Sequence, residues 1–162
     1  MDKLSIVKNK ISTQEDLPKW LSWSRFQQKK IVFTNGCFDI IHRGHIEYLA
    51  KAASFGDLLV IGLNTDSSVK RLKGEKRPLL DQLARATILA ALQFVDKVVY
   101  FEEDTPLQLI QFIQPHVLVK GSDYKAENIV GYDVVKQNGG IVVTIDFIDG
   151  YSTSSIIEKA RL

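Results

Sequence analysis

Cysteine is nearly absent from this sequence, since Cys37 is the only one among 162 residues. A single cysteine excludes a disulfide within the chain, and such usage is typical of proteins in a reducing cytoplasm. No apolar run approaches the roughly 20 residues that a membrane-spanning helix needs. Residues 1–4 also lack the apolar region of a signal peptide. We therefore expect a cytoplasmic protein with no membrane partner.

An excess of charge of one sign is missing as well. The 21 Lys and Arg residues nearly balance the 19 Asp and Glu residues, which leaves a formal net charge of +2. This charge is too small to favour nucleic acid or a membrane surface as a partner. The composition is that of an ordinary globular protein, and the length suits one domain that buries its core without disulfides or metals.

Apolar runs and amphipathic segments alternate from Lys30 onward. The apolar runs that we expect to form strands are 30–35, 58–63, 98–101, 117–119 and 141–145. Strands separated by helices predict βαβ units, and hence an α/β fold with a Rossmann-like, doubly wound parallel sheet of about five strands. We expect this domain to span residues 30–162. The expected helices are 45–54, 69–72, one capped by Asp81, one starting at 104–106, 127–138 and 156–161.

Residues 1–29 differ from the rest and are predicted to be a helical N-terminal lead-in. Residues 12–15, Ser-Thr-Gln-Glu, resemble a capping box. Leu17, Trp20 and Leu21 have the spacing of an apolar helical stripe, and Pro18 suits a first helical turn. We expect this helix to pack on the domain.

A tight polar loop at residues 34–45 joins the first predicted strand to the first helix of the domain. His42 and His45 stand three residues apart in it, close to Gly36 and Gly44. A helix N-terminus offers unpaired N–H groups to a phosphate, and glycines let the backbone approach it. Imidazoles add donors for charge that develops on phosphate oxygens. The loop therefore predicts a polyphosphate site, which polar residues after the other strands would complete at one edge of the sheet.

Two other interpretations of the histidines start from the same spacing. They could be two metal ligands, but no third or fourth His or Cys accompanies them, and His116 precedes an apolar strand. They could also be surface histidines in a turn. The loop matches neither the Gly-x-Gly-x-x-Gly nor the Walker A pattern, which disfavours hydride transfer and P-loop hydrolysis. We expect no protein-bound metal.

The loop resembles the signature of the nucleotidylyltransferase superfamily, whose hallmark is His-x-Gly-His. Residues 34–39 together with His42, Arg43, Gly44 and His45 carry this resemblance. Further segments resemble the heptose 1-phosphate adenylyltransferase branch, which occurs alone or as the C-terminal half of a bifunctional kinase–adenylyltransferase: 62–66, 71–74, 103–106, 119–124 and 152–157. The resemblance covers about residues 28–162.

The resemblance implies transfer of AMP from ATP to a heptose 1-phosphate, giving ADP-heptose and pyrophosphate for lipopolysaccharide or other surface glycans. A sugar phosphate oxygen is already ionised at pH 7, so the enzyme must supply placement and charge neutralisation, with no general base. Mg²⁺ would be bound mainly through the nucleotide phosphates. The resemblance also allows a homodimer and a separate heptose kinase in the same pathway.

The resemblance further implies roles for particular residues. The expected catalytic residues are His42, His45 and Lys73. The expected nucleotide-binding residues are Thr34, Asn35, Gly36, Cys37, Phe38, Lys120, Gly121, Asp123, Ser152, Thr153 and Ser154. The expected substrate-binding residues are Asp39, Asp66, Arg77 and Arg85.

Simpler structural roles remain open for several of these residues. Arg85 could pair with Asp81 at i,i+4. Lys73 and Arg77 could belong to a solvated charged loop, and residues 152–154 could cap the last helix. Asp39 could orient a loop group or a metal-bound water.

Two other functions also remain open. One is a cytidylyltransferase acting on glycerol 3-phosphate or a related alcohol phosphate, and the other is a non-catalytic nucleotide-binding module. Cytidylyltransferase relatives carry Arg-Thr-Glu-Gly where this chain has Phe-Ile-Asp-Gly at 147–150. This difference removes a phosphate-binding arginine and weakens the cytidylyltransferase interpretation.

Overall fold

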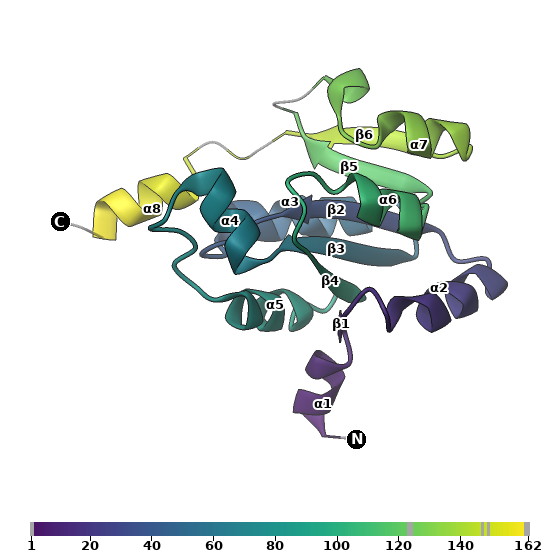
Figure 1. Cartoon of the computed structure of the whole chain (residues 1–162), viewed down its shortest axis with the longest axis horizontal. Coiled ribbons are helices and arrows are strands. Elements are labelled where there is room, and N and C mark those ends of the chain that lie inside the picture. Colours follow the sequence, from purple (N-terminus) through teal and green to yellow (C-terminus); the bar gives the residue numbers. More distant parts are fainter. Residues whose placement is uncertain (1, 123–124, 147, 149, 161–162) are drawn as a thin grey trace.

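The protein is built around one parallel β-sheet (Figure 1). The structure, a computed structural model, describes residues 2–122, 125–146, 148 and 150–160. The strand order in the sheet is β1-β4-β3-β2-β5-β6. The strands are β1 (Ile11–Ser12), β2 (Ile31–Gly36), β3 (Leu58–Asn64), β4 (Lys97–Phe101), β5 (Val117–Gly121) and β6 (Ile141–Ile145).

Helices cover both faces of the sheet. They are α1 (Lys3–Lys8), α2 (Leu17–Phe26), α3 (Arg43–Ala53), α4 (Asp66–Lys73), α5 (Gln82–Ala90), α6 (Leu107–Ile113), the short 3₁₀ turn η1 (Ala126–Asn128), α7 (Tyr132–Gln137) and α8 (Thr153–Ala160). Leu49 of α3 and Leu89 of α5 are buried in the core on one face. Leu17 of α2, Ile110 of α6 and Val135 of α7 are buried on the other. Strands covered on both sides explain the near-continuous apolar runs in the sequence.

The order of the strands reverses at β2, which lies at the centre of the sheet. From β2 the chain adds β3 and then β4 on one side, and it then crosses to add β5 and β6 on the other. In open parallel sheets, ligands bind beyond the carboxyl ends of the strands at such a reversal. The loops after β2, β3 and β5 are therefore placed where a ligand is expected.

The predicted α/β fold and its five strands are confirmed, and each observed strand begins or ends within two residues of its predicted limits. The sheet has one more strand than expected in the described chain, because β1 of the lead-in pairs with β4. Ser12 consequently lies in a strand, so the predicted capping box is wrong. Its hydroxyl accepts a hydrogen bond from Lys97 Nζ at 3.0 Å instead.

Three helix expectations also change. A short helix, α1, precedes β1 within the lead-in. The single helix predicted over 127–138 is divided into η1 and α7, because Gly131 adopts φ +92° directly before α7 and interrupts the helical path. Helix α8 begins at Thr153, three residues before the predicted start. The cap at Asp81 is confirmed, since its carboxylate accepts from Ala84 N at 2.8 Å.

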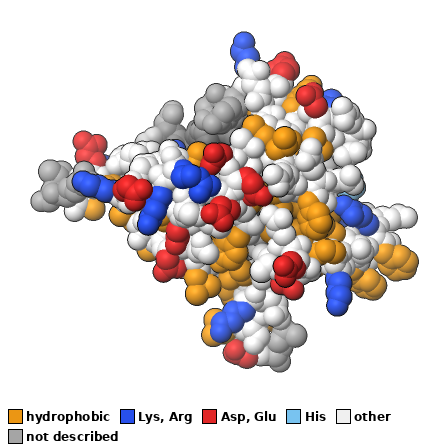
Figure 2. Space-filling model, in the orientation of Figure 1, with side chains coloured by type: hydrophobic (Ala, Val, Ile, Leu, Met, Phe, Trp, Pro, Cys, Tyr) orange, Lys and Arg blue, Asp and Glu red, His pale blue; other side chains and the backbone are white. Residues whose placement is uncertain are grey.

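The surface carries charges of both signs. On the face shown in Figure 2, acidic and basic side chains are interspersed, in keeping with the net charge of +2. Among the described residues, no helix combines the length and apolar character needed to cross a membrane.

Helix α2 gives a test of whether the lead-in stabilises the domain. Leu21 is 2% exposed against the core, whereas Trp23 on the same helix is 58% exposed. We expect Leu21→Ala to lower the free energy of unfolding by about 2–5 kcal/mol, because it removes a buried side chain and leaves a cavity. Trp23→Ala should change it by about 0.5 kcal/mol or less. Urea denaturation followed by circular dichroism measures both, and equal effects would contradict a structural role for α2.

Candidate active site

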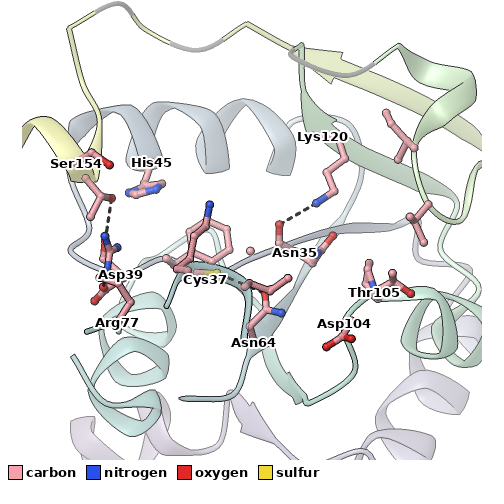
Figure 3. Close-up of a pocket in the computed structure, with 18 of the residues that line it drawn as sticks. Asn35, Cys37, Asp39, His45, Asn64, Arg77, Asp104, Thr105, Lys120 and Ser154 are labelled. Atoms are coloured by element: carbon pink, nitrogen blue, oxygen red, sulfur yellow. Dashed lines mark hydrogen bonds and ion pairs between the residues drawn. The ribbon is translucent and has the colours of Figure 1, made fainter. Parts of the chain in front are cut away.

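A cavity of about 570 Å³ lies beyond the carboxyl ends of the central strands (Figure 3). Its volume is in the range of small-molecule binding sites. The lining residues are Asn35, Gly36, Cys37, Phe38, Asp39, His45, Asn64, Leu72, Lys73, Arg77, Asp104, Thr105, Pro106, Lys120, Asn128, Ile129, Val130, Thr153 and Ser154. The cavity therefore gathers the loops after β2, β3, β4 and β5, the end of α4 and the first turn of α8.

The two histidines of the loop are stacked on each other. Their ring centroids are 3.8 Å apart with an interplanar angle of 27°. Gly44 makes this possible, since a Cβ at that position would lie 3.1 Å from the His42 ring and 3.2 Å from Cβ of Tyr151. His45 lines the cavity, whereas His42 packs behind it, between His45 and the Tyr151 ring. The glycine of the His-x-Gly-His motif thus serves the stacking of the histidines.

Both imidazoles are neutral at pH 7. Burial, and then the neighbouring His42, lower the pKa of His45 to about 4, and burial lowers the pKa of His42 as well. The Nδ1 atoms of both rings are buried and have no hydrogen-bond partner among the described residues. Buried polar atoms in folded proteins are nearly always paired, so two neighbouring unpaired ring nitrogens are an unusual feature of this loop.

The loop between β2 and α3 contains two non-glycine residues with unfavourable backbone conformations. Phe38 and Ile40 adopt φ values of +46° and +57°, in the left-handed region that non-glycine residues rarely occupy. The Phe38 ring makes an edge contact with His45, with centroids 5.5 Å apart. Such conformations persist only where surrounding interactions hold them, and they cluster at functional sites.

Asp39, between those two residues, supplies the interactions that hold the loop. Its side chain is 1% exposed, and Arg77 Nε donates to Oδ2 at 2.7 Å. The backbone N–H groups of Leu79 and Leu80 donate to the same carboxylate at 2.9 and 3.1 Å. Thr153 Oγ1 donates to its carbonyl oxygen at 3.0 Å. One residue therefore joins the loop to the α4–α5 connection and to α8.

These contacts correct the expected role of Asp39. The carboxylate was predicted to bind substrate, but three protein donors occupy it and it is buried. It orients a loop group, Arg77, which was the other interpretation considered. Arg77 and Lys73 both line the cavity, so they do not belong to a merely solvated loop.

Arg85 is likewise a structural residue in this arrangement. Its side chain is fully buried, with Nη2 2.8 Å from Asp66 Oδ1. The guanidinium also donates to the carbonyl oxygens of Cys37, Asn64 and Leu80 at 2.6, 2.8 and 3.1 Å. The predicted side-chain pair with Asp81 is not formed, and neither Arg85 nor Asp66 lines the cavity. Arg85 stabilises the ends of β2 and β3 from behind the site.

Four other predicted residues lie away from the cavity or cannot be placed. Thr34 Oγ1 is buried and lies 2.8 Å from the hydroxyl oxygen of Tyr48, and Thr34 does not line the cavity. Gly121 ends β5 behind the lining. Ser152 Oγ accepts from Ser155 N at 3.1 Å, which is the capping role considered for it. Asp123 lies outside the described residues.

Several lining residues were not predicted. Asn64 and residues 104–106 lie in segments that carry the family resemblance, but no binding role was predicted for them, and 104–106 were interpreted as a helix start. Residues 128–130 were assigned to a helix, although Gly131 was a signal that the helix is interrupted there. Leu72 lies beside the predicted Lys73. These residues face the cavity because of the tertiary arrangement, which their local sequence does not reveal.

Cys37 has no features of a reactive thiol. Burial raises the pKa of its thiol, so the neutral form predominates at pH 7. Its Sγ lies 3.9 Å from Asn64 Oδ1, and its carbonyl is one of the acceptors of Arg85. Within the described part of the chain, no group of three or more His, Cys, Asp or Glu side chains could hold a metal ion.

The doubly wound sheet, the cavity at its strand reversal and the stacked histidines at that cavity are typical of a nucleotide-binding α/β protein. A family model described as cytidylyltransferase-like matches residues 33–159. This match covers well over half of the chain, so the chain belongs to the cytidylyltransferase-like family. The resemblance to nucleotidylyltransferases is thereby confirmed.

The relatives include larger proteins. The bifunctional protein HldE of Geobacter metallireducens is 57% identical over 150 residues, which are 93% of this chain and 31% of that protein. HldE of Campylobacter jejuni subsp. jejuni is 55% identical over 152 residues, which are 94% of this chain and 32% of that protein. The chain therefore spans about a third of the length of these relatives.

A solved structure shares the architecture. It is the crystal structure of the lipopolysaccharide core biosynthesis protein from Thermoplasma volcanium GSS1. The two structures have a TM-score of 0.60 and 28% sequence identity, and the match covers 76% of this chain and 99% of that chain.

The neutral state of His45 can be tested by NMR. We expect its imidazole to titrate near pH 4 in the free protein, and inorganic tripolyphosphate to raise that pKa because anionic oxygens favour the imidazolium. The unfolded chain would take up this proton near pH 6.5, so lowering the pH from about 6.5 to 4 should destabilise the fold. His45→Gln, which assigns the resonance, should remove that part of the pH dependence. A midpoint near 6.5 in the free protein would contradict the assignment.

The structural role of Arg85 can be separated from substrate binding. We expect Arg85→Ala to lower the free energy of unfolding by about 3–5 kcal/mol, because a buried charge pair loses one partner and several carbonyls lose their donor. Arg43→Ala is a matched control, since Arg43 is exposed and pairs with Glu47 at the surface, and its effect should be much smaller. Urea denaturation measures both. If the Arg85→Ala protein had normal stability, the structural role would be contradicted, and substrate binding would again be the expected role of Arg85.

Proposed function

We propose that this protein is an adenylyltransferase that transfers AMP from ATP to a heptose 1-phosphate, releasing pyrophosphate and forming ADP-heptose. The observation that carries the proposal is the His42–His45 stack, whose buried Nδ1 atoms lack partners beside a cavity that Lys73 and Arg77 also line. The motifs that resemble the heptose 1-phosphate branch support it. So do the high identity to HldE proteins and the likeness to a lipopolysaccharide core biosynthesis protein.

The reaction needs neutralisation of charge more than it needs proton transfer. A phosphate oxygen of the acceptor attacks the α-phosphorus of the nucleotide, and the bond from that phosphorus to the departing pyrophosphate breaks. Negative charge grows on the α-phosphate oxygens and on the leaving group. The acceptor oxygen is already ionised at pH 7, so no side chain has to remove a proton from it.

The cavity side chains are suited to that task. His45 reaches the cavity as a neutral ring that can donate one N–H to a phosphate oxygen, and His42 holds that ring by stacking. Lys73 and Arg77 supply positive charge from the α4 end and the following loop. Thr153 and Ser154 line the cavity from the first turn of α8, the end of a helix at which backbone N–H groups are available to a phosphate.

Mg²⁺ is part of this proposal. The described residues offer no cluster of protein ligands, which agrees with an ion held chiefly by phosphate oxygens of the nucleotide. Bound there, it would neutralise part of the phosphate charge and help to set the geometry of the polyphosphate. The chain's own contribution is then to bind and orient the phosphates through His45, Lys73 and Arg77.

The wider setting follows from the same proposal. ADP-heptose would serve as a precursor of lipopolysaccharide or another surface glycan, and a heptose kinase would supply the acceptor. A homodimer and a cytoplasmic location remain predictions. Size-exclusion chromatography with light scattering tests the first of these.

Substrate pairs test the proposal directly. The purified protein is incubated with ATP or CTP and either heptose 1-phosphate or glycerol 3-phosphate, and pyrophosphate release is measured. We expect turnover with ATP and heptose 1-phosphate. Turnover with CTP and glycerol 3-phosphate alone would favour a cytidylyltransferase. Nucleotide binding without any turnover would favour a non-catalytic module.

The contribution of His45 to catalysis has an expected size. We expect His45→Ala to lower kcat by about 10²–10⁴, because a donor to the developing phosphate charge is lost. Trp23→Ala, on the exposed side of α2 and remote from the lining, is the control and should keep the wild-type rate. Near-normal kcat in the His45 variant would remove the histidine loop from the mechanism.

A further inference from the structure

The two ends of the cavity differ in chemistry. His45, Arg77 and Ser154 lie toward one end, with Asp39 beside them, whereas Asp104 and Thr105 lie at the opposite end (Figure 3). The first end carries the groups that suit phosphate. The second end contains the carboxylate of Asp104 and the hydroxyl of Thr105, and Lys120 lies between the two ends. Asn128 adds an amide to the lining of the cavity.

The carboxylate of Asp104 is held in place from α4. Arg71 Nε donates to Asp104 Oδ1 at 3.0 Å, and the same guanidinium donates to the carbonyl oxygen of Glu102. Arg71 Nη1 also lies 3.8 Å from Glu102 Oε1. The Arg71 and Asp104 side chains are 46% and 71% exposed, so this contact orients the Asp104 carboxylate and adds little to the stability of the fold.

Helix α4 therefore influences both ends of the cavity. Leu72 and Lys73 line it directly, while Arg71, one residue earlier, anchors the segment that carries Asp104. A shift of this helix would move a phosphate-binding cation and the Asp104 loop together.

The charge of Asp104 limits what can bind next to it. A carboxylate repels the oxygens of a polyphosphate, so this end of the cavity is unsuited to phosphate. An ionised carboxylate only accepts hydrogen bonds, and its two oxygens can accept from two adjacent hydroxyls at once. Thr105 and Asn128 add groups that can either donate or accept. Together these groups suit a ring that carries several hydroxyls.

We propose that Asp104 accepts hydrogen bonds from neighbouring hydroxyls of a sugar ring, and that Arg71 is the positioning residue that holds Asp104 for this contact. The inference rests on the proposed function and deepens it, because both substrates of that reaction contain a sugar. The ring is either the ribose of the nucleotide or the sugar of the acceptor. The recognition chemistry is the same in both cases.

Steady-state kinetics of Asp104→Asn test the proposal and identify the ring. Hydrogen bonds to a charged group are worth about 1.5–3 kcal/mol, so we expect the KM of one substrate to rise about 10-fold to 100-fold while kcat changes less than about threefold. If Asp104 binds hydroxyls of the acceptor sugar, the KM for the acceptor rises and the KM for ATP stays constant. If Asp104 binds hydroxyls of the ribose, the KM for ATP rises. The variant then also loses the wild-type preference for ATP over 2′-deoxy-ATP or 3′-deoxy-ATP.

Two variants at the anchor separate positioning from general stability. Arg71→Ala should raise the same KM by a smaller factor, and Arg71→Lys should recover part of the loss. Adding Arg71→Ala to Asp104→Asn should cost little more than Asp104→Asn alone, because both changes act through one contact. Glu102→Gln is the matched control, since Glu102 touches Arg71 without lining the cavity, and its KM values should stay within about twofold of wild type.

Other outcomes overturn the inference. Unchanged KM values in Asp104→Asn would show that the Asp104 carboxylate of the wild type accepts no hydrogen bond from a substrate hydroxyl. A loss of kcat with constant KM would place Asp104 in the chemical step instead. Fully additive effects of the Arg71 and Asp104 changes would remove the positioning role. A wild-type protein without turnover would refute the proposed function itself, and that result is distinct from an active wild type with unaffected variants.

Discussion

The buried carboxylate of Asp39 is the interaction on which the rest of the site depends. It binds the Arg77 guanidinium and two backbone N–H groups of the α4–α5 connection, while its own carbonyl accepts from Thr153. A buried carboxylate is tolerated only when it is paired and fully hydrogen-bonded, and these partners meet that requirement. The same contacts hold Phe38 and Ile40 in left-handed backbone conformations. Through one side chain, the fold thus sets the shape of the loop and the position of a cavity-lining arginine.

A buried cation, Arg85, completes this support from the other side. Asp39 acts on the cavity side of the loop, whereas Arg85 holds the carbonyls at the ends of β2 and β3 and pairs with Asp66. Neither residue is positioned to touch a ligand through its charge. The groups at the cavity that suit phosphate include the imidazole of His45, the cations Lys73, Arg77 and Lys120, and the first turn of α8. This division between supporting and contacting residues explains why Asp39, a charged residue of the family motif, is buried.

The sequence was most informative where a pattern is local and repeated. Alternating apolar runs predicted the parallel sheet, and the spacing of His42, Gly44 and His45 pointed to a loop whose His45 lines the cavity. Prediction failed where tertiary contacts decide. Strand β1 has only two residues, which is too short for the alternation of apolar and polar residues that marks a strand in a sequence. The period of two along β2 places Thr34 and Asn35 on opposite sides but does not tell which side is the core. The i,i+4 spacing suggested Asp81 as the ion-pair partner of Arg85. In the folded protein, Arg85 pairs with Asp66 instead and donates hydrogen bonds to three carbonyl oxygens.

The contact between Thr153 and Asp39 has a consequence for how the protein becomes functional during synthesis. The two residues are separated by 114 positions in the chain. Contacts between distant segments form late, because the loop that joins them must be closed at an entropic cost. Strands β1 to β6 precede α8 in the chain, so a nascent chain can pair them before α8 is synthesised, but the Thr153 contact that helps to hold the histidine loop forms only afterwards. The lining of the cavity is complete only when the first turn of α8, with Thr153 and Ser154, has docked on the loop.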